Sequence, residues 1–160
     1  MPLDPRVHSD ERLEPRHPLP HISRRALRRV KNPLPAPTEC PYCSGLVELV
    51  SNSRIYNGRE FGEWPYAFHC EPCDAYVGLH PHTDIPLGTL ANVELRGARK
   101  VHKTYFQKVC ETFDLGRTPA YQWLAGAMGI PVGECHFGWF NKQQCEQAGL
   151  LCLKRLQVIG

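Results

Sequence analysis

Two pairs of cysteines with the same spacing constrain this chain more than any other feature. Cys40 and Cys43 form the first pair, Cys70 and Cys73 form the second, and 26 residues separate the pairs. Two such pairs on two β-turns are the usual way in which a short chain surrounds Zn²⁺ with four thiolates. A unit of about 40 residues with few large apolar side chains also needs additional stabilisation, which a bound metal ion can provide. The spacing therefore predicts one structural zinc ion, held by all four cysteines.

Two alternatives use the same cysteines. The first pair, CPYC, is a dithiol motif of redox proteins, but a helix should then follow it directly and lower the pKa of a thiolate. Here the strand-like run SGLVELV follows, and we set redox catalysis aside. Four thiolates also suit iron, but nothing else in the chain indicates electron transfer, so zinc remains the preferred ion.

The other four cysteines form no further pair of this spacing. Free cysteine behaves as a small hydrophobic residue, and we expect all four to be buried thiols: Cys110, Cys135, Cys145 and Cys152. A second site that uses Cys135, His136 and Cys145 is conceivable, but its spacing is poor.

Length and composition suit a soluble globular protein. The chain has 160 residues, of which 42% are hydrophobic and 22% are charged. No apolar run reaches the roughly 18 residues that a membrane-spanning helix needs, and the first residues lack the apolar core of a secretory signal. We therefore expect a cytoplasmic protein with no membrane partner, in which cysteines are ligands or thiols rather than disulfides.

The positive charge lies in the first 38 residues. They contain eight Lys or Arg against four acids, whereas residues 39–160 contain eleven against twelve. Eight of the 15 prolines also fall there, so we expect an extended or disordered arm. Ser23 can cap one short helix within it. A basic tail suits an anionic partner, nucleic acid first, and its candidate phosphate contacts are Arg24, Arg25, Arg28, Arg29 and Lys31.

Residues 39–156 are predicted to form a single zinc-binding domain of the α+β class. Residues 39–85 read as a small zinc-ribbon-like antiparallel β unit, with Asn57-Gly58 as a tight turn, and residues 86–156 as about three α-helices. The first helix would be capped by Thr89, the second would run from Thr118-Pro119 to Gly129, and the third would begin at Asn141 with Gln144 completing a capping box.

The first predicted helix has two faces. Its apolar side chains recur at helical spacing and should face the core: Val93, Ala98, Val101, Tyr105, Val109 and Phe113. Basic side chains gather on the opposite face and are further candidates for phosphate contact: Arg96, Arg99, Lys100 and Lys103.

Histidines and one aspartate form a possible functional cluster. A hydrolytic metal site would use histidine and carboxylate ligands around an open position, and the candidates are His80, His82, Asp84, His102 and His136. No short signature such as HExxH is present, and structural roles for these histidines are favoured. His69 directly precedes Cys70 and should point away from the metal.

Three stretches carry a family resemblance: CPYCSG, HCEPCDAYVGLHPHTDIPLGTLANVELR and TPAYQWLAGAMGIPVGECHFGWFNKQQC. Over about residues 39–153 the chain resembles an uncharacterised zinc-finger-containing domain family of bacterial and phage proteins. The resemblance implies zinc on the two cysteine pairs and the cytoplasm of a bacterial cell or a phage-infected host. The family motifs also include the positions of His80, Asp84, His102, His136 and Cys145, without a role for them.

Three functions compete. The first is nucleic-acid binding or regulation by a non-enzymatic zinc module, with Tyr42, Tyr56 and Trp64 stacking on unpaired bases. The second is a protein-interaction adaptor, or an inhibitor of a host or phage nucleic-acid enzyme, anchored by the aromatic residues Trp64, Trp139 and Phe140. The third is a metal-dependent nuclease that uses the histidine cluster.

Overall fold

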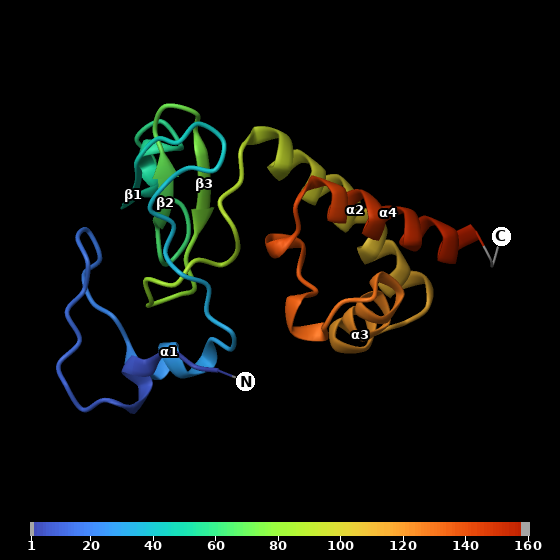
Figure 1. Ribbon diagram of the computed structural model, residues 1–160, viewed down its shortest axis with the longest axis horizontal. Coiled ribbons are helices and arrows are strands. Elements are labelled where there is room, and N and C mark those ends of the chain that lie inside the picture. The colour runs from blue at the N-terminus through green and yellow to red at the C-terminus, as the bar shows by residue number, and fades with distance from the viewer. Residues whose placement is uncertain (1, 158–160) are drawn as a thin grey trace. The chain divides into compact units, whose positions relative to one another are not determined.

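The computed structural model describes residues 2–157, and the chain divides into two compact units. The first unit runs to Asn92 and the second begins at Val93 (Figure 1). The sequence had suggested boundaries at residues 38 and 85, but the arm and the ribbon share the first unit. No helix among the described residues combines the length and the apolar character that a membrane span requires.

The first unit contains a three-stranded antiparallel sheet in the order β1-β2-β3. Its strands are β1 (Val47–Ser51), β2 (Tyr66–Cys70) and β3 (Ala75–Gly78). The register places Leu49 opposite Phe68, and Phe68 opposite Val77. These three side chains form a buried row across one face of the sheet, because alternate residues of a strand point to the same face. The sheet and the helices that follow confirm the α+β class.

The connection from β1 to β2 begins with the 3-10 helix η2 (Asn52–Arg54) and contains the predicted tight turn. Asn57 has φ 55° and Gly58 has φ 87°. The N–H of Arg59 donates to the carbonyl of Tyr56 at 3.2 Å. Two central residues with positive φ are what a hairpin turn of this type requires, and asparagine and glycine adopt such angles most readily.

The N-terminal arm is mostly irregular, as expected, but it is packed rather than disordered. It contains the 3-10 helix η1 (Pro5–His8) and the helix α1 (Arg24–Arg29), and the Ser23 hydroxyl accepts from the N–H of Ala26 at 3.2 Å as the predicted cap. Apolar residues spaced between the prolines explain the packing. Leu27 lies fully buried in a cluster with Val7, Val30 and Ile85, and Leu19 joins the core of the sheet.

The second unit consists of α2 (Val93–Thr112), α3 (Arg117–Met128) and α4 (Lys142–Gln157). The 3-10 helices η3 (Val132–Glu134) and η4 (Phe137–Trp139) connect α3 to α4. The helices α2 and α4 lie side by side (Figure 1). All three helices were predicted, although α2 begins four residues after Thr89, which is therefore not its cap.

The buried face of α2 differs from the predicted one. Val93 is 73% exposed and Val101 is 51% exposed, whereas Leu95, Phe106 and Val109 are buried. Continued at helical spacing, the buried face also includes the half-buried Arg99 and His102. Of the predicted set, Val109 is buried, and Ala98, Tyr105 and Phe113 are half-buried. The observed face is therefore shifted from the predicted one, because an arginine and a histidine occupy two of its positions.

The ends of α3 and α4 follow local rules. Gly116, not Thr118, is the N-cap of α3, and the helix ends as predicted at Gly129, which has φ 72°. The buried side chains of α3 include Tyr121, Leu124, Ala125 and Met128. At the start of α4 the backbone N–H of Asn141 donates to Gln144 Oε1 at 3.0 Å, and that of Gln144 to Asn141 Oδ1 at 2.8 Å. This reciprocal pair confirms the capping box.

Candidate metal centre

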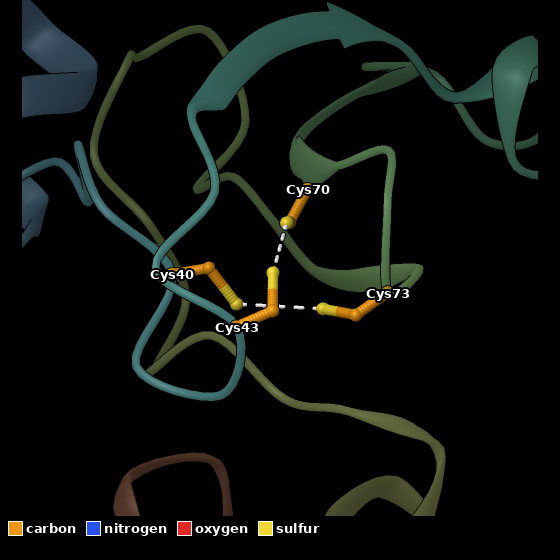
Figure 2. A group of neighbouring side chains, drawn as sticks. All are labelled: Cys40, Cys43, Cys70 and Cys73. Atoms are coloured by element: carbon orange, nitrogen blue, oxygen red, sulfur yellow. Dashed lines mark hydrogen bonds between the residues drawn. The ribbon is translucent and has the colours of Figure 1, made fainter.

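The four predicted cysteines converge from two turns of the first unit. Cys40 and Cys43 precede β1, and Cys70 and Cys73 flank the turn between β2 and β3 (Figure 2). The Sγ atoms of Cys40 and Cys73 are 3.4 Å apart, as are those of Cys43 and Cys70, and all four lie within 4.8 Å of one another. Four sulfurs at about 2.3 Å from one zinc ion would be about 3.8 Å apart. The cluster therefore fits one tetrahedral zinc ion.

The two turns have the same backbone. Ser44 has φ 62° and Asp74 has φ 58°, so the residue after the second cysteine of each pair is left-handed. The N–H of Ser44 donates to the carbonyl of Cys40 at 2.9 Å, and that of Asp74 to the carbonyl of Cys70 at 2.8 Å. Neither turn has glycine at this position, and the aspartate of the second turn tolerates the left-handed conformation.

Gly45 serves the site through its size rather than its φ. Glycine often supplies the left-handed residue of such a turn, but here that residue is Ser44. A Cβ atom on Gly45 would lie 3.1 Å from the Sγ of Cys43 and 3.2 Å from the Sγ of Cys70. The chain therefore passes so close to two zinc ligands that a side chain would crowd them.

Burial raises the pKa of the thiols, and backbone N–H groups oppose it. At Cys40 the backbone N–H groups of Tyr42 and Cys43, together with hydrogen bonds to the thiols of Cys73 and Cys70, outweigh burial and lower the pKa to about 7. Burial raises the pKa of Cys70 to about 12 and also raises the pKa of Cys73. Zinc must therefore displace protons from this cluster when it binds.

His69 is no ligand, as predicted. Its Nε2 lies 2.9 Å from Asp74 Oδ1, and its side chain is 7% exposed. The histidine ties β2 to the left-handed residue that follows Cys73.

A comparison with family models matches residues 36–154 to a zinc-finger-containing domain. The chain belongs to that family. The matched residues contain all four cysteines, so the family and the geometry agree on a zinc-binding module with one zinc ion. Searches of curated proteins and of solved structures returned no match.

In either unit of this zinc-finger-containing domain, the described residues gather no second metal-binding group. The four cysteines are the one cluster of three or more histidine, cysteine and carboxylate side chains found in residues 2–157. Cys135, His136 and Cys145 do not come together, and neither unit assembles such a group from His80, Asp84, His102 and His136. Cys135, Cys145 and Cys152 are buried, and Cys110 is half-buried.

The segment from His80 to Asp84 holds the N-terminal arm. The Arg6 guanidinium donates to Asp84 Oδ1 at 2.7 Å and to Oδ2 at 3.0 Å. The N–H of Ser23 donates to the carbonyl of His82 at 2.9 Å. Asp84 lies within the residues matched to the family, and it binds an arginine that lies 78 residues away. No spacing rule could have located this pair.

Aromatic rings form a second contact between arm and ribbon. His21 Nε2 lies 3.0 Å from His82 Nδ1, and both rings pack near Trp64, with centroids 5.1 and 4.9 Å away. The indole N–H of Trp64 donates to the carbonyl of Thr83 at 2.9 Å. Sequence reasoning missed His21, because nothing in its local pattern points to His82.

The remaining candidates of the histidine cluster have different surroundings. His80 is half-buried, and burial lowers its pKa. His102 points its ring at Gly149 of α4, and its buried Nδ1 has no hydrogen-bond partner among the described residues. His136 packs between Tyr121 and Trp139.

Most of the basic candidates are exposed, but two support the fold. Arg24 donates to the carbonyl of Arg6 at 3.1 Å and to that of Glu11. Arg99 donates to the carbonyl of Phe140 from Nε at 3.2 Å and from Nη2 at 3.0 Å. Arg96 is half-buried, and the remaining basic candidates are exposed: Arg25, Arg28, Arg29, Lys31, Lys100 and Lys103.

Charge is segregated along the chain more sharply than the arm alone suggests. Residues 39–92, the ribbon with its loops, contain two Lys or Arg against seven acids, whereas residues 93–160 contain nine against five. The ribbon is therefore acidic, and the helical unit is basic like the arm.

The aromatic anchors of the adaptor hypothesis are partly used inside the fold. Phe140 is fully buried, and Trp64 is half-buried beneath the histidine pair. Phe140 therefore offers no surface to a partner.

Proposed function

We propose that this zinc-binding module binds nucleic acid through the basic residues of its arm. The observation that carries the proposal is the amphipathic helix α1. Its Leu27 is fully buried, while Arg25, Arg28 and Arg29 are exposed. Lys31 follows directly and is also exposed. Guanidinium groups bind phosphates well because their planar N–H donors match the phosphate oxygens.

The arm would present these charges in a fixed arrangement. Arg6 is held by Asp84, the Ser23 N–H by the carbonyl of His82, and Arg24 by two carbonyls of the arm itself. A surface that is ordered before binding loses less conformational entropy when it meets its ligand. This favours a specific basic surface over a loose polycationic tail.

The helix α2 offers a second basic stripe. Arg96, Lys100 and Lys103 follow one another at intervals of four and three residues, so they lie on one side of the helix. In the ribbon, Tyr42 is 42% exposed and Tyr56 is 39% exposed, and such rings can stack on unpaired bases. The acidic side chains of the ribbon would repel the phosphate groups. The phosphates would therefore bind to the arm and to the helical unit.

The test compares the zinc-loaded protein with a triple variant in which Arg25, Arg28 and Arg29 are glutamine. Each phosphate contact contributes about −0.9 to the slope of log affinity against log salt for duplex DNA. The variant should therefore bind a labelled duplex more weakly, with a slope shallower by about 2.7. The measurement is fluorescence anisotropy over a range of salt concentrations, repeated with single-stranded DNA and RNA.

A matched control removes three exposed charges outside the arm, by glutamine at Arg59, Lys108 and Lys154. It loses the same net charge and should keep most of the slope. Undetectable binding by the parent protein, or equal losses in the two triple variants, would refute a binding surface on α1.

A further inference from the structure

A shallow hollow of about 180 Å³ lies on the outer face of the sheet, beside the second cysteine turn. The strand β1 and the residue before it contribute Leu46, Glu48 and Val50, which alternate along the chain and so face the same side. Glu71 and Pro72, between the two ligands Cys70 and Cys73, also line the hollow, and Arg54 and His69 complete its lining. The hollow lies away from α1 in the sequence and contains none of the residues proposed to contact phosphates.

The walls of the hollow combine apolar surface with acidic groups. Leu46 is 68% exposed, although it is a large apolar residue. Glu48 pairs with Arg54 at 3.7 Å, but both side chains are more than half exposed, at 56% and 58%, so solvent weakens this pair. The carboxylate of Glu71 makes no ion pair among the described residues. The hollow therefore has an excess of negative charge above an apolar wall.

This chemistry suits the side chain of lysine or arginine. Such a side chain has an apolar stem, which can lie along Leu46 and Pro72, and a cationic end that can reach the carboxylate of Glu71. The surrounding ribbon, with two Lys or Arg against seven acids in residues 39–92, attracts a cationic ligand and disfavours phosphate groups at the hollow. Charge complementarity therefore selects a basic protein segment as the occupant.

We propose that the hollow is a docking site for a lysine or arginine side chain in a basic segment of a partner protein. This site is separate from the proposed nucleic-acid surface and does not depend on it. The two together would let one small module contact an anionic and a cationic partner on different surfaces.

The test uses the full zinc-loaded chain and a fluorescent peptide in which lysines alternate with serines. A twin peptide carries glutamine at each lysine position. We expect saturable binding of the lysine peptide by fluorescence anisotropy and no binding of the twin. Glu71→Gln should weaken binding about threefold to fivefold, the size expected for one partly exposed ion pair. Zinc content, measured for each variant, confirms that the cysteine cluster is intact.

Two controls separate the hollow from general charge. Glu60→Gln removes the same charge from an exposed residue outside the hollow and should change affinity less than twofold. Leu46→Ser changes no charge but removes the apolar wall, and it should weaken binding by at least twofold.

The proposal is wrong if the lysine peptide shows no saturable binding. It is also wrong if Glu71→Gln and Glu60→Gln lose the same affinity for the peptide, or if Leu46→Ser keeps the affinity of the parent protein. A dimer that forms without peptide and dissociates in Glu71→Gln would also overturn it, because the occupant would then be a second copy of this chain.

Discussion

Replacing Gly45 with alanine should damage the zinc site without removing a ligand. The added methyl group would lie 3.1 Å from the Sγ of Cys43 and 3.2 Å from the Sγ of Cys70, where ordinary contacts of this kind begin at 3.4 Å. To remove these close contacts, one or both sulfur atoms must move by a few tenths of an ångström. Zinc–sulfur bonds keep their length to about 0.2 Å, so the required shift is as large as the site tolerates.

The loss of zinc affinity expected for Gly45→Ala can be given a size. Changes to groups that position metal ligands weaken metal binding by about 10- to 100-fold, and we expect Gly45→Ala to fall in this range. At 25 °C that corresponds to about 1.4 to 2.7 kcal/mol. Zinc binding stabilises the folded ribbon, so the variant should unfold at a lower temperature when zinc is limiting and should recover as zinc is added.

Competition with a chromophoric chelator measures zinc affinity directly, and thermal unfolding at several zinc concentrations gives the linked stability. Gly97→Ala is the matched control, since no atom lies within 4 Å of a Cβ at that position of α2. It should leave zinc affinity unchanged and raise stability by up to about 1 kcal/mol through helix propensity. If Gly45→Ala binds zinc as tightly as the parent protein, the crowding argument is wrong.

Three further changes test contacts inside each unit. Arg6→Gln removes the ion pair to Asp84 and should release the arm, which limited proteolysis or hydrogen exchange of residues 2–30 would detect, at a cost of about 1 kcal/mol; unchanged protection of the arm would contradict this. Gly149→Ala places a methyl group against the ring of His102 and should destabilise the second unit by about 1 to 3 kcal/mol in chemical denaturation, whereas a gain in stability would show that the ring moves aside freely. Asn141→Ala removes one half of the capping box of α4 and should cost about 1 kcal/mol by the same measurement; a loss below a few tenths would contradict the role of the cap.

The sequence predicted those features that depend on local rules. The cysteine spacing, the Asn57-Gly58 turn, the Ser23 cap and the capping box at Asn141 all follow from a few neighbouring residues. The caps and the tight turn were confirmed because their hydrogen bonds and positive φ angles involve only neighbouring residues. The zinc site was confirmed because each cysteine pair has a recognisable local spacing, although the tetrahedron needs both pairs.

Features that depend on distant residues were missed or misread. The arm looked unable to pack because of its prolines, yet Leu19 and Leu27 find buried places on the ribbon. Arg99 read as a phosphate contact because its partner, the carbonyl of Phe140, lies 41 residues further along the chain. No local sequence pattern indicates the burial of these leucines or the hydrogen bond of Arg99.

Asp84 shows the same limit at the candidate site. As part of a family motif it suggested a catalytic or metal-binding group. An aspartate side chain can serve in such a site or form a structural ion pair, and the sequence alone does not distinguish the two. The Arg6 guanidinium that it holds lies in the arm, at a separation of 78 residues, so only the folded chain shows the contact.

The pairing of Arg6 with Asp84 also sets an order of events during synthesis. A ribosome adds about 5 to 20 residues per second, so Arg6 waits for roughly 4 to 16 s before its partner has even been made. During that interval Leu19 and Leu27 have no ribbon to cover them. The arm, although translated first, is therefore among the last parts of its unit to reach its final place, and newly made chains are most exposed to proteases and chaperones at this end.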